Sequence, residues 1–220
     1  MSESEFEPVP GLPERLPPGE RMLWQGAPHW LALALGAFRL RVVAIYFAAL
    51  MAWRAASALH DGAPAVDALA YALDLAPLAL AAIGILLVIA VTAARTTLYT
   101  ITDRRIVMRF GMALPLTVNI PFSQVDGASL ARHEGNVGDI ALTVRPEGRI
   151  AYLMMWPHVR PWRYAQPEPM LRALPDVERA ATILGDALAA HAGAPARPIP
   201  QAAAASEAPD MRGAPAPAAS

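Results

Sequence analysis

The 220-residue sequence has a net charge of −1, with 55% hydrophobic and only 17% charged side chains. This composition is more apolar than that of an ordinary soluble domain and indicates a part that avoids water. The nearly neutral charge argues against a nucleic-acid partner, which is normally bound by a basic face. Since the chain has no cysteine, disulfides, thiolate metal sites, iron–sulfur clusters and cysteine nucleophiles are excluded.

Residues 1–40 form an N-terminal segment whose first half is acidic and rich in proline. It lacks the order of positive charge followed by an apolar stretch that an export signal requires. We expect it to lead into a membrane anchor from the cytoplasmic side.

Residues 41–95 are predicted to form a transmembrane hairpin, because a helix needs about 20 apolar residues to cross a bilayer. The first helix is expected at about residues 42–59, interrupted only by Arg54, and the second at about residues 70–94. Gly62 and Pro64 lie between the two stretches and favour a short turn.

Arginines flank this hairpin on one side only. Arg39 and Arg41 precede the first helix and Arg95, Arg104 and Arg105 follow the second, whereas the connecting loop has none. Since positive charge near helix ends stays on the cytoplasmic side, we expect a multi-pass protein of the cytoplasmic (inner) membrane. Both termini and the domain after the hairpin should then be cytoplasmic.

Arg54 and Asp74 are the two charges inside the predicted helices. Each lies a similar number of residues from the connecting loop, so both should reach a similar depth, and we predict that they pair near the outer interface. The alternative is that Arg54 extends to the headgroups while Asp74 lies outside the hydrocarbon core. Neither helix interior has a histidine, so a pigment, haem or other cofactor site is not expected.

Residues 96–190 are predicted to form a small β domain, because short β-branched and aromatic runs alternate with turn residues. The expected antiparallel strands are residues 96–102, 105–110, 116–121, 128–133, 140–145 and 150–155. Apolar residues spaced by three or four over residues 169–190 predict an amphipathic helix that closes one end of this domain. The Ala/Pro-rich residues 191–220 are predicted to be disordered.

Three stretches, in this order around the hairpin, resemble the bacterial pleckstrin-homology-like membrane proteins. They are GERMLWQGAPHW (residues 19–30), YTITDRRIVMRFG (residues 99–111) and VNIPFSQVDG (residues 118–127). The resemblance implies an α+β membrane protein in which a two-helix transmembrane hairpin carries a pleckstrin-homology-like antiparallel β domain with a C-terminal capping helix.

A narrower likeness is carried by EFEPVPGLPERLPPGERMLWQG (residues 5–26), AIYFAALMAWR (residues 44–54) and MMWPHVRPWRYAQPEPMLRALPD (residues 154–176). These stretches resemble the photosynthetic complex assembly proteins of purple bacteria. The resemblance implies a non-enzymatic assembly factor whose partners are subunits of the reaction centre and the core light-harvesting complex. The other reading is a membrane-anchored module of the pleckstrin-homology-like type that senses lipid or the state of the envelope.

A cluster of aromatic and basic residues follows the last expected strand, and we predict that it docks a partner protein or lipid headgroups. The residues assigned to this partner-binding surface are Trp156, His158, Arg160, Trp162 and Arg163. The alternative is that both tryptophans pack into the domain and the arginines are merely solvated.

Four arginines follow the second helix closely in sequence, namely Arg95, Arg104, Arg105 and Arg109. They are the candidates for contact with anionic headgroups at the membrane surface. The simpler alternative is that they only fix the orientation of the hairpin.

No catalytic or metal site is expected. The acidic residues of the domain fall at predicted turns, without a paired nucleophile and base or a distinctive spacing of carboxylates. The five histidines are scattered without the spacing of metal ligands. The sequence leaves open whether copies of the chain form a homo-oligomer.

Overall fold

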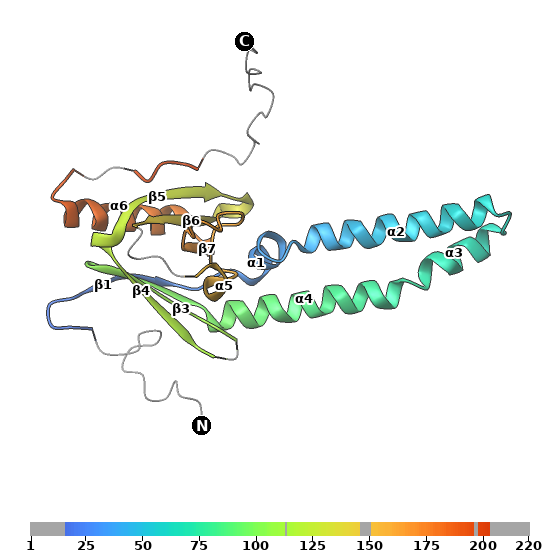
Figure 1. Cartoon of the computed structure of the whole chain (residues 1–220), viewed down its shortest axis with the longest axis horizontal. Coiled ribbons are helices and arrows are strands. Elements are labelled where there is room, and N and C mark those ends of the chain that lie inside the picture. The colour runs from blue at the N-terminus through green and yellow to red at the C-terminus, as the bar shows by residue number, and fades with distance from the viewer. Residues whose placement is uncertain (1–15, 113, 146–150, 196–197, 203–220) are drawn as a thin grey trace, which may run out of the picture.

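The computed structural model describes residues 16–112, 114–145, 151–195 and 198–202. A long helical hairpin projects from a domain built of two antiparallel sheets and a C-terminal helix (Figure 1). The α+β fold class expected from the sequence is therefore confirmed.

The helical hairpin consists of α2 (Leu40–His60), α3 (Ala65–Leu73) and α4 (Ala76–Thr96). Helix α1 (Trp30–Gly36) packs at the end of the hairpin nearest the domain, which we call its foot. Helix α2 leads away from the domain, and α3 and α4 return beside it (Figure 1). Two segments, Leu40–His60 and Ala65–Thr96, are long and apolar enough to cross a membrane. No residue of α2 is buried within the protein, and its exposed apolar side chains include Val42, Ile45 and Trp53.

The second apolar stretch is broken into α3 and α4, whereas the sequence predicted one helix over residues 70–94. Asp74 ends α3, and Pro77 lies in the first turn of α4. Proline has no amide hydrogen, and its ring would clash with the carbonyl of residue 73 in a continuous helix. The break therefore falls just before the proline.

Part of the N-terminal segment belongs to the domain, which the sequence did not predict. Strand β1 (Met22–Gly26) pairs antiparallel with the first strand after the hairpin. Helix α1 then packs on the last turns of α4, where Leu33 and Ala34 form one cluster with Ala90 and Ala93. The foot of the hairpin is therefore formed by the segment that precedes the hairpin, α1, and by the last turns of α4.

The first sheet has the order β1-β2-β3-β4. Its remaining strands are β2 (Leu98–Thr102), β3 (Arg105–Phe110) and β4 (Leu116–Pro121). Strand β2 starts directly after α4 and runs away from the hairpin, and β3 returns so that Arg109 pairs with Leu98. The tight turn at Asp103 and Arg104 therefore lies at the end of the sheet that is remote from α4.

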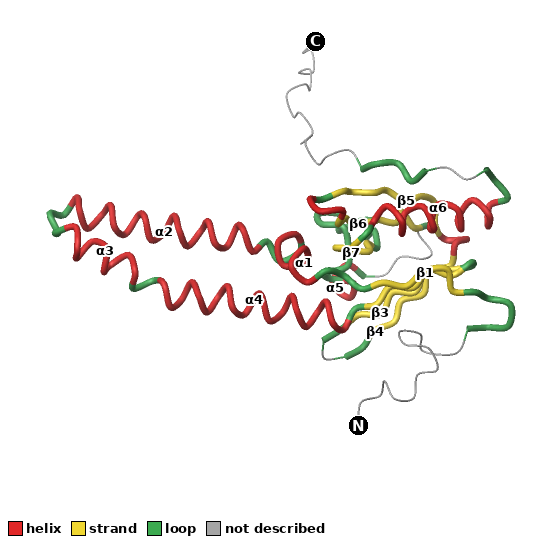
Figure 2. Tube along the Cα trace, turned by 180° about the vertical axis from the view of Figure 1, so that it is seen from behind, coloured by secondary structure: helices red, strands yellow, loops and turns green. Residues whose placement is uncertain are grey.

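The second sheet has the order β5-β6-β7. Its strands are β5 (Val125–Arg132), β6 (Val137–Val144) and β7 (Met170–Pro175), with short 3-10 turns at η2 (Phe122–Gln124) and η3 (Glu134–Asn136). Helix α6 (Val177–Ala192) follows β7. Side chains from both sheets and from α6 share one core, which includes Ile101, Met108, Ile140, Leu171 and Leu184. Figure 2 shows this helix lying with the second sheet, above the first.

Two of the predicted elements, the strand at residues 150–155 and the start of the last helix at residue 169, were wrong. In place of a strand over residues 150–155 the chain forms a short helix, α5 (Tyr152–Met155), while residue 150 lies outside the described part. Leucine and methionine favour helix, and Pro157 then prevents its continuation. The helix expected from residue 169 begins only at Val177, because residues 170–175 pair with β6 and Pro175 ends that strand.

Part of the tail predicted to be disordered is ordered. Residues 198–202 run beside β5, where the Leu130 amide donates to the Pro200 carbonyl (2.9 Å) and the Ala202 amide donates to the Leu130 carbonyl (2.7 Å). Ile199 packs against the core. The segment therefore satisfies backbone groups on the edge of the second sheet. Residues 203–220 lie outside the described part of the chain.

Candidate functional site

The loop between α5 and β7 carries the aromatic and basic residues singled out from the sequence. Its two ends are tied together, because the Arg160 amide donates to the Glu168 carbonyl (2.9 Å) and the Met170 amide donates to the His158 carbonyl (3.0 Å). Val159 and Pro169 form a β-bridge between these bonds. Residues 160–168 are therefore a closed loop on a fixed base.

His158 does not belong to a docking surface, contrary to the prediction. Its side chain is only 1% exposed and lies between the end of α4 and the start of β2. The imidazole Nδ1 lies 2.7 Å from the Tyr99 hydroxyl, and Nε2 lies 3.2 Å from the Thr97 hydroxyl. The histidine therefore helps to join the hairpin to the domain core. Nothing in the sequence around His158 distinguishes it from an exposed histidine, because its neighbours Trp156 and Trp162 are exposed.

The hydrogen bonds around His158 determine which of its ring nitrogens carries the hydrogen. The Thr97 hydroxyl donates to the Ala93 carbonyl (2.7 Å), so its oxygen must accept the hydrogen of His158 Nε2. Nδ1 then accepts from the Tyr99 hydroxyl, whose oxygen accepts from the Arg172 amide (3.2 Å). This assignment of the tautomer follows from the donors and acceptors and gives each polar side-chain group of the cluster a partner.

Burial favours the neutral form of both rings, as that assignment requires. Burial, together with the nearby positive charge of Arg172, lowers the pKa of His158 to about 3. Burial also raises the pKa of the Tyr99 phenol well above its usual value. Both groups are therefore neutral near pH 7. A buried pair whose hydrogen bonds are all satisfied makes the surrounding core more rigid.

Glu168 positions the two arginines of the loop. Its carboxylate is buried, and it lies 2.9 Å from Nη1 of Arg160 and 3.6 Å from Nη1 of Arg163. One acid thus holds two guanidinium groups, which leaves one net positive charge on the loop surface. The Arg163 side chain remains half exposed beside the aromatic residues.

The aromatic residues of the loop point outwards. Trp162 is 75% exposed, Tyr164 61% and Trp156 50%. Tyr164 lies edge-on to Trp162 (6.3 Å between ring centres) and also contacts Tyr152 of α5 (4.7 Å). We call the surface formed by Tyr152, Trp156, Trp162, Arg163 and Tyr164 the aromatic loop surface.

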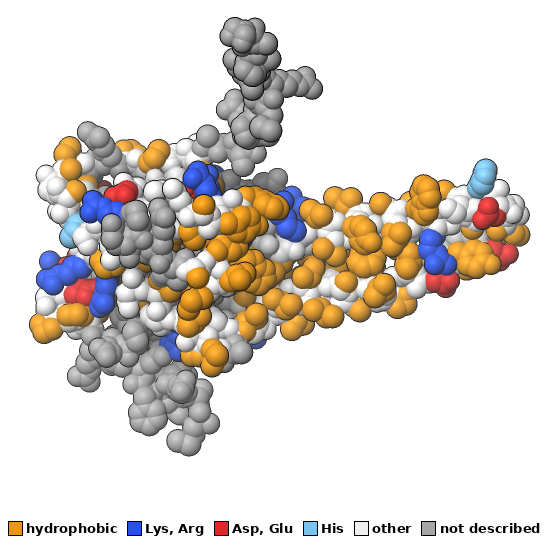
Figure 3. All heavy atoms as spheres, in the orientation of Figure 1, with side chains coloured by type: hydrophobic (Ala, Val, Ile, Leu, Met, Phe, Trp, Pro, Cys, Tyr) orange, Lys and Arg blue, Asp and Glu red, His pale blue; other side chains and the backbone are white. Residues whose placement is uncertain are grey.

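The aromatic loop surface lies at the foot of the hairpin. Trp156 packs edge-on against Phe38, which precedes α2 (5.6 Å between ring centres). Leu153 and Met154 of α5 are also exposed, and sequence reasoning did not assign them or the two tyrosines to the site. Hydrophobic side chains cover the hairpin and continue onto the adjoining face of the domain (Figure 3).

The structure brings Arg54 and Asp74 together across the hairpin. Nη2 of Arg54 lies 3.8 Å from Oδ2 of Asp74, and both side chains are accessible from outside the helix pair. The pair lies where α3 ends, towards the tip of the hairpin and away from the domain (Figure 1).

The four arginines that follow the second helix do not form one cluster, contrary to expectation. Arg95 and Arg109 lie at the foot of α4, since Arg109 pairs in register with Leu98. Arg104 and Arg105 lie at the other end of β2, a strand whose five residues span roughly 16 Å. Arg105 is bound there by the buried Glu20, with Nε–Oε1 at 2.9 Å and Nη2–Oε2 at 3.1 Å.

His133 and Asp139 form the remaining polar contact of note. His133 Nε2 lies 3.0 Å from Asp139 Oδ2, and this hydrogen bond raises the pKa of the histidine. The other oxygen of Asp139 accepts from the Ala173 amide (2.7 Å), so the acid serves to hold β7 beside β6. Within the described ranges, no group of three or more His, Asp or Glu residues could hold a metal ion.

Comparison with known proteins gives the family. A family model described as a bacterial PH domain matches residues 30–188, which include both the hairpin and most of the domain. A 23.7 kDa protein of Rhodobacter capsulatus, named for its place in the puhA 5′ region, is 38% identical over 192 residues, or 87% of this chain and 90% of the relative. No solved structure matches the chain. The chain therefore belongs to the bacterial PH domain family.

Proposed function

We propose that this chain is a membrane-anchored assembly factor, of the kind called PuhB, for the photosynthetic reaction centre and its core light-harvesting complex. It works without catalysing a reaction, by holding a membrane subunit through the aromatic loop surface. The observation that carries the proposal is the position of this surface, which is exposed and adjoins the foot of the apolar hairpin.

The relative from Rhodobacter capsulatus supports the photosynthetic setting. Its name places it in the puhA 5′ region, and this position agrees with the resemblance of the present chain to the photosynthetic complex assembly proteins. The two proteins match over nearly their full lengths, so the hairpin and the domain are both shared. A role in the same process is the simplest reason for a shared architecture of this kind.

The composition of the aromatic loop surface supports a protein partner. Tryptophan, tyrosine and arginine are the residue types that contribute most to binding energy in protein interfaces. Trp162 and Tyr164 are in edge-on ring contact, and Arg163 lies near Glu168, so the groups that a partner would cover lie together on one surface.

The buried polar groups support a binding role over a catalytic one. His158 and Tyr99 are closed off from solvent and bonded to each other and to their neighbours. Their hydrogen bonds serve the junction between the hairpin and the sheet. The exposed aromatic groups of the aromatic loop surface, in contrast, are accessible to a partner.

The hairpin is assigned to the cytoplasmic membrane, with both termini and the domain in the cytoplasm. Two segments of the described chain are long and apolar enough to span a bilayer. Arg39, Arg41 and Arg95 lie at the domain end of these segments, and the turn at residues 61–64 at the other end has no arginine. This charge asymmetry favours a cytoplasmic domain.

Co-purification from photosynthetic membranes tests the function. The wild-type chain should retain reaction-centre or core light-harvesting subunits, and the double variant W162A/Y164A should lose them while remaining abundant in the membrane. M22A/L23A is the matched control, since it removes two exposed side chains from β1 on the same domain. Equal recovery of the subunits with both variants, or lipid-dependent behaviour without any photosynthetic subunit, would contradict the proposal.

A further inference from the structure

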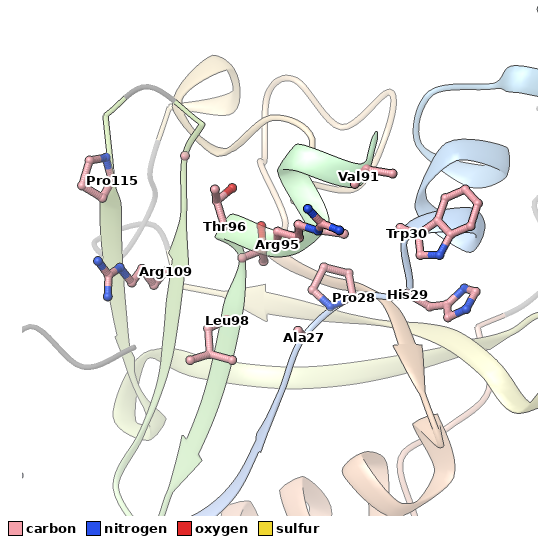
Figure 4. A pocket seen from close by; sticks show the side chains of 13 residues that line it. Ala27, Pro28, His29, Trp30, Val91, Arg95, Thr96, Leu98, Arg109 and Pro115 are labelled. Carbon is pink, nitrogen blue, oxygen red and sulfur yellow. The ribbon is translucent and has the colours of Figure 1, made fainter. Parts of the chain in front are cut away.

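A groove of about 830 Å³ opens where α4 meets the domain (Figure 4). Its walls come from three parts of the chain: the β1–α1 connection at residues 27–30, the α4–β2 junction at Val91 and residues 94–98, and β3 with the loop that follows it. Ligand-binding pockets of proteins usually enclose about 300–1,000 Å³. The groove is thus large enough for a polar headgroup.

The charged side chains of this groove are basic. Arg95 comes from the last turn of α4, and Arg109 from β3. Figure 4 shows that the Arg95 side chain extends towards the wall with Pro28 and Trp30, while Arg109 lies on the opposite wall with Pro115. None of the described residues that line the groove is acidic. The groove therefore favours an anion, and most directly one beside Arg95 and Trp30.

The rim of the groove is apolar. Trp30 of α1 lines one side of the groove and is exposed; on the other side, the β3–β4 loop that contributes Gly111 and Pro115 also carries the exposed Met112 and Leu114. Val91 continues the groove onto the side of α4, where Val88 is also exposed. A small soluble anion makes no apolar contact with these side chains, whereas a phospholipid has acyl chains next to its phosphate that can cover them.

We propose that this groove binds the phosphate headgroup of an anionic phospholipid. The Arg95 guanidinium contacts the phosphate, Trp30 lies at the level of the headgroups, and the acyl chains follow α4 past Val91 and Val88. Tryptophan favours this membrane depth, and arginine attracts anionic headgroups. The lipid would thereby fix the domain against the membrane surface, independently of the aromatic loop surface.

Native mass spectrometry of the full-length protein in detergent tests the site, with phosphatidylglycerol and phosphatidylcholine added in turn. We expect phosphatidylglycerol to be retained preferentially, and R95Q to weaken this binding by about fivefold, the effect of one arginine near an anionic surface. R95K should retain most of the binding, because it keeps the charge. R104Q is the matched control, since it removes an exposed arginine at the remote end of β2.

Equal binding of the two lipids, or unchanged binding by R95Q, would overturn the proposal. Displacement of phosphatidylglycerol by an equal concentration of inorganic phosphate would also overturn it, because the site would then be selective for a free anion. The measurement needs no photosynthetic subunit, so its outcome is separate from that of the assembly proposal.

Discussion

The imidazole of His158 and the phenol of Tyr99 meet at 2.7 Å in the interior, at the junction of the hairpin and the first sheet. Through Thr97 this contact reaches the last turn of α4, and through the Arg172 amide it reaches β7. The helical anchor and both sheets are thus joined by one chain of hydrogen bonds.

Removal of the Tyr99 hydroxyl should destabilise the protein. Y99F leaves His158 Nδ1 without its donor and the Arg172 amide without its acceptor, and each buried group left unpaired costs about 1–3 kcal/mol. Thermal unfolding in detergent measures the loss. Y164F is the control, because Tyr164 is exposed, and it should unfold like the wild type. Equal stability of Y99F and the wild type would show that the buried contact contributes nothing.

The stability should fall as the pH drops from about 6.5 towards 3, in part because of His158. Its folded pKa of about 3 lies below the ordinary value of 6.5, so the unfolded chain binds the extra proton over this range. The contribution is complete above pH 6.5 and is lost towards pH 3, with a slope of up to about 1.4 kcal/mol per pH unit.

A comparison of the wild type with H158Q isolates this contribution, since His133 acts in the opposite sense. Asp139 raises the pKa of His133, so that residue stabilises at low pH and loses its effect as the pH rises through its folded pKa. Urea unfolding from pH 7 to 4 should show a smaller loss of stability in H158Q than in the wild type. Parallel curves would mean that the pKa of His158 is the same in the folded and the unfolded protein, which would contradict its lowered folded value.

Arg105 should matter for stability and not for lipid binding. R105A leaves the Glu20 carboxylate, which is 8% exposed as a residue, without its two charged hydrogen bonds, at a cost of about 1–3 kcal/mol. The double variant E20A/R105A should recover part of this loss, because no buried charge is left. R104A, which changes the exposed neighbour, should unfold normally. A larger loss in the double variant than in R105A would contradict this interpretation.

Arg54 and Asp74 should be coupled in a bilayer. Removal of either partner leaves the other as an unpaired charge near the outer end of the predicted spans, so R54A and D74A should each reduce the stability of the protein in nanodiscs. The double variant should lose less than the sum of the two single variants, because it leaves neither charge alone. Strict additivity would mean that the 3.8 Å contact contributes no stability.

The parts of this fold that could be predicted from the sequence have strong local patterns. The hairpin follows from the length of its apolar stretches, and β2 and β3 from β-branched residues around a tight turn. Strand β1 could not be predicted in this way, because it is stabilised by pairing with a strand about 75 residues later. Strand β7 fits a helical pattern in the sequence, because Leu171 and Leu174 continue the three-to-four-residue spacing of α6, and only the pairing with β6 makes this segment a strand.

The candidate site was predicted only in part, for a related reason. Exposed Trp162 and buried His158 lie four residues apart, and nothing in the local sequence separates their environments. Arg105 was assigned to the membrane surface because it follows α4 closely in sequence. A strand carries it away from that helix, and its partner Glu20 is 85 residues distant.

A photo-crosslinking residue in place of Trp162 tests the central claim most directly, in cells that are assembling the photosynthetic apparatus. The same residue at position 23, on exposed β1, is the control. We expect position 162, and not position 23, to give a covalent adduct with a reaction-centre or core light-harvesting subunit. Absence of these subunits from the adducts at position 162, with the protein present in the membrane, would contradict the proposed function.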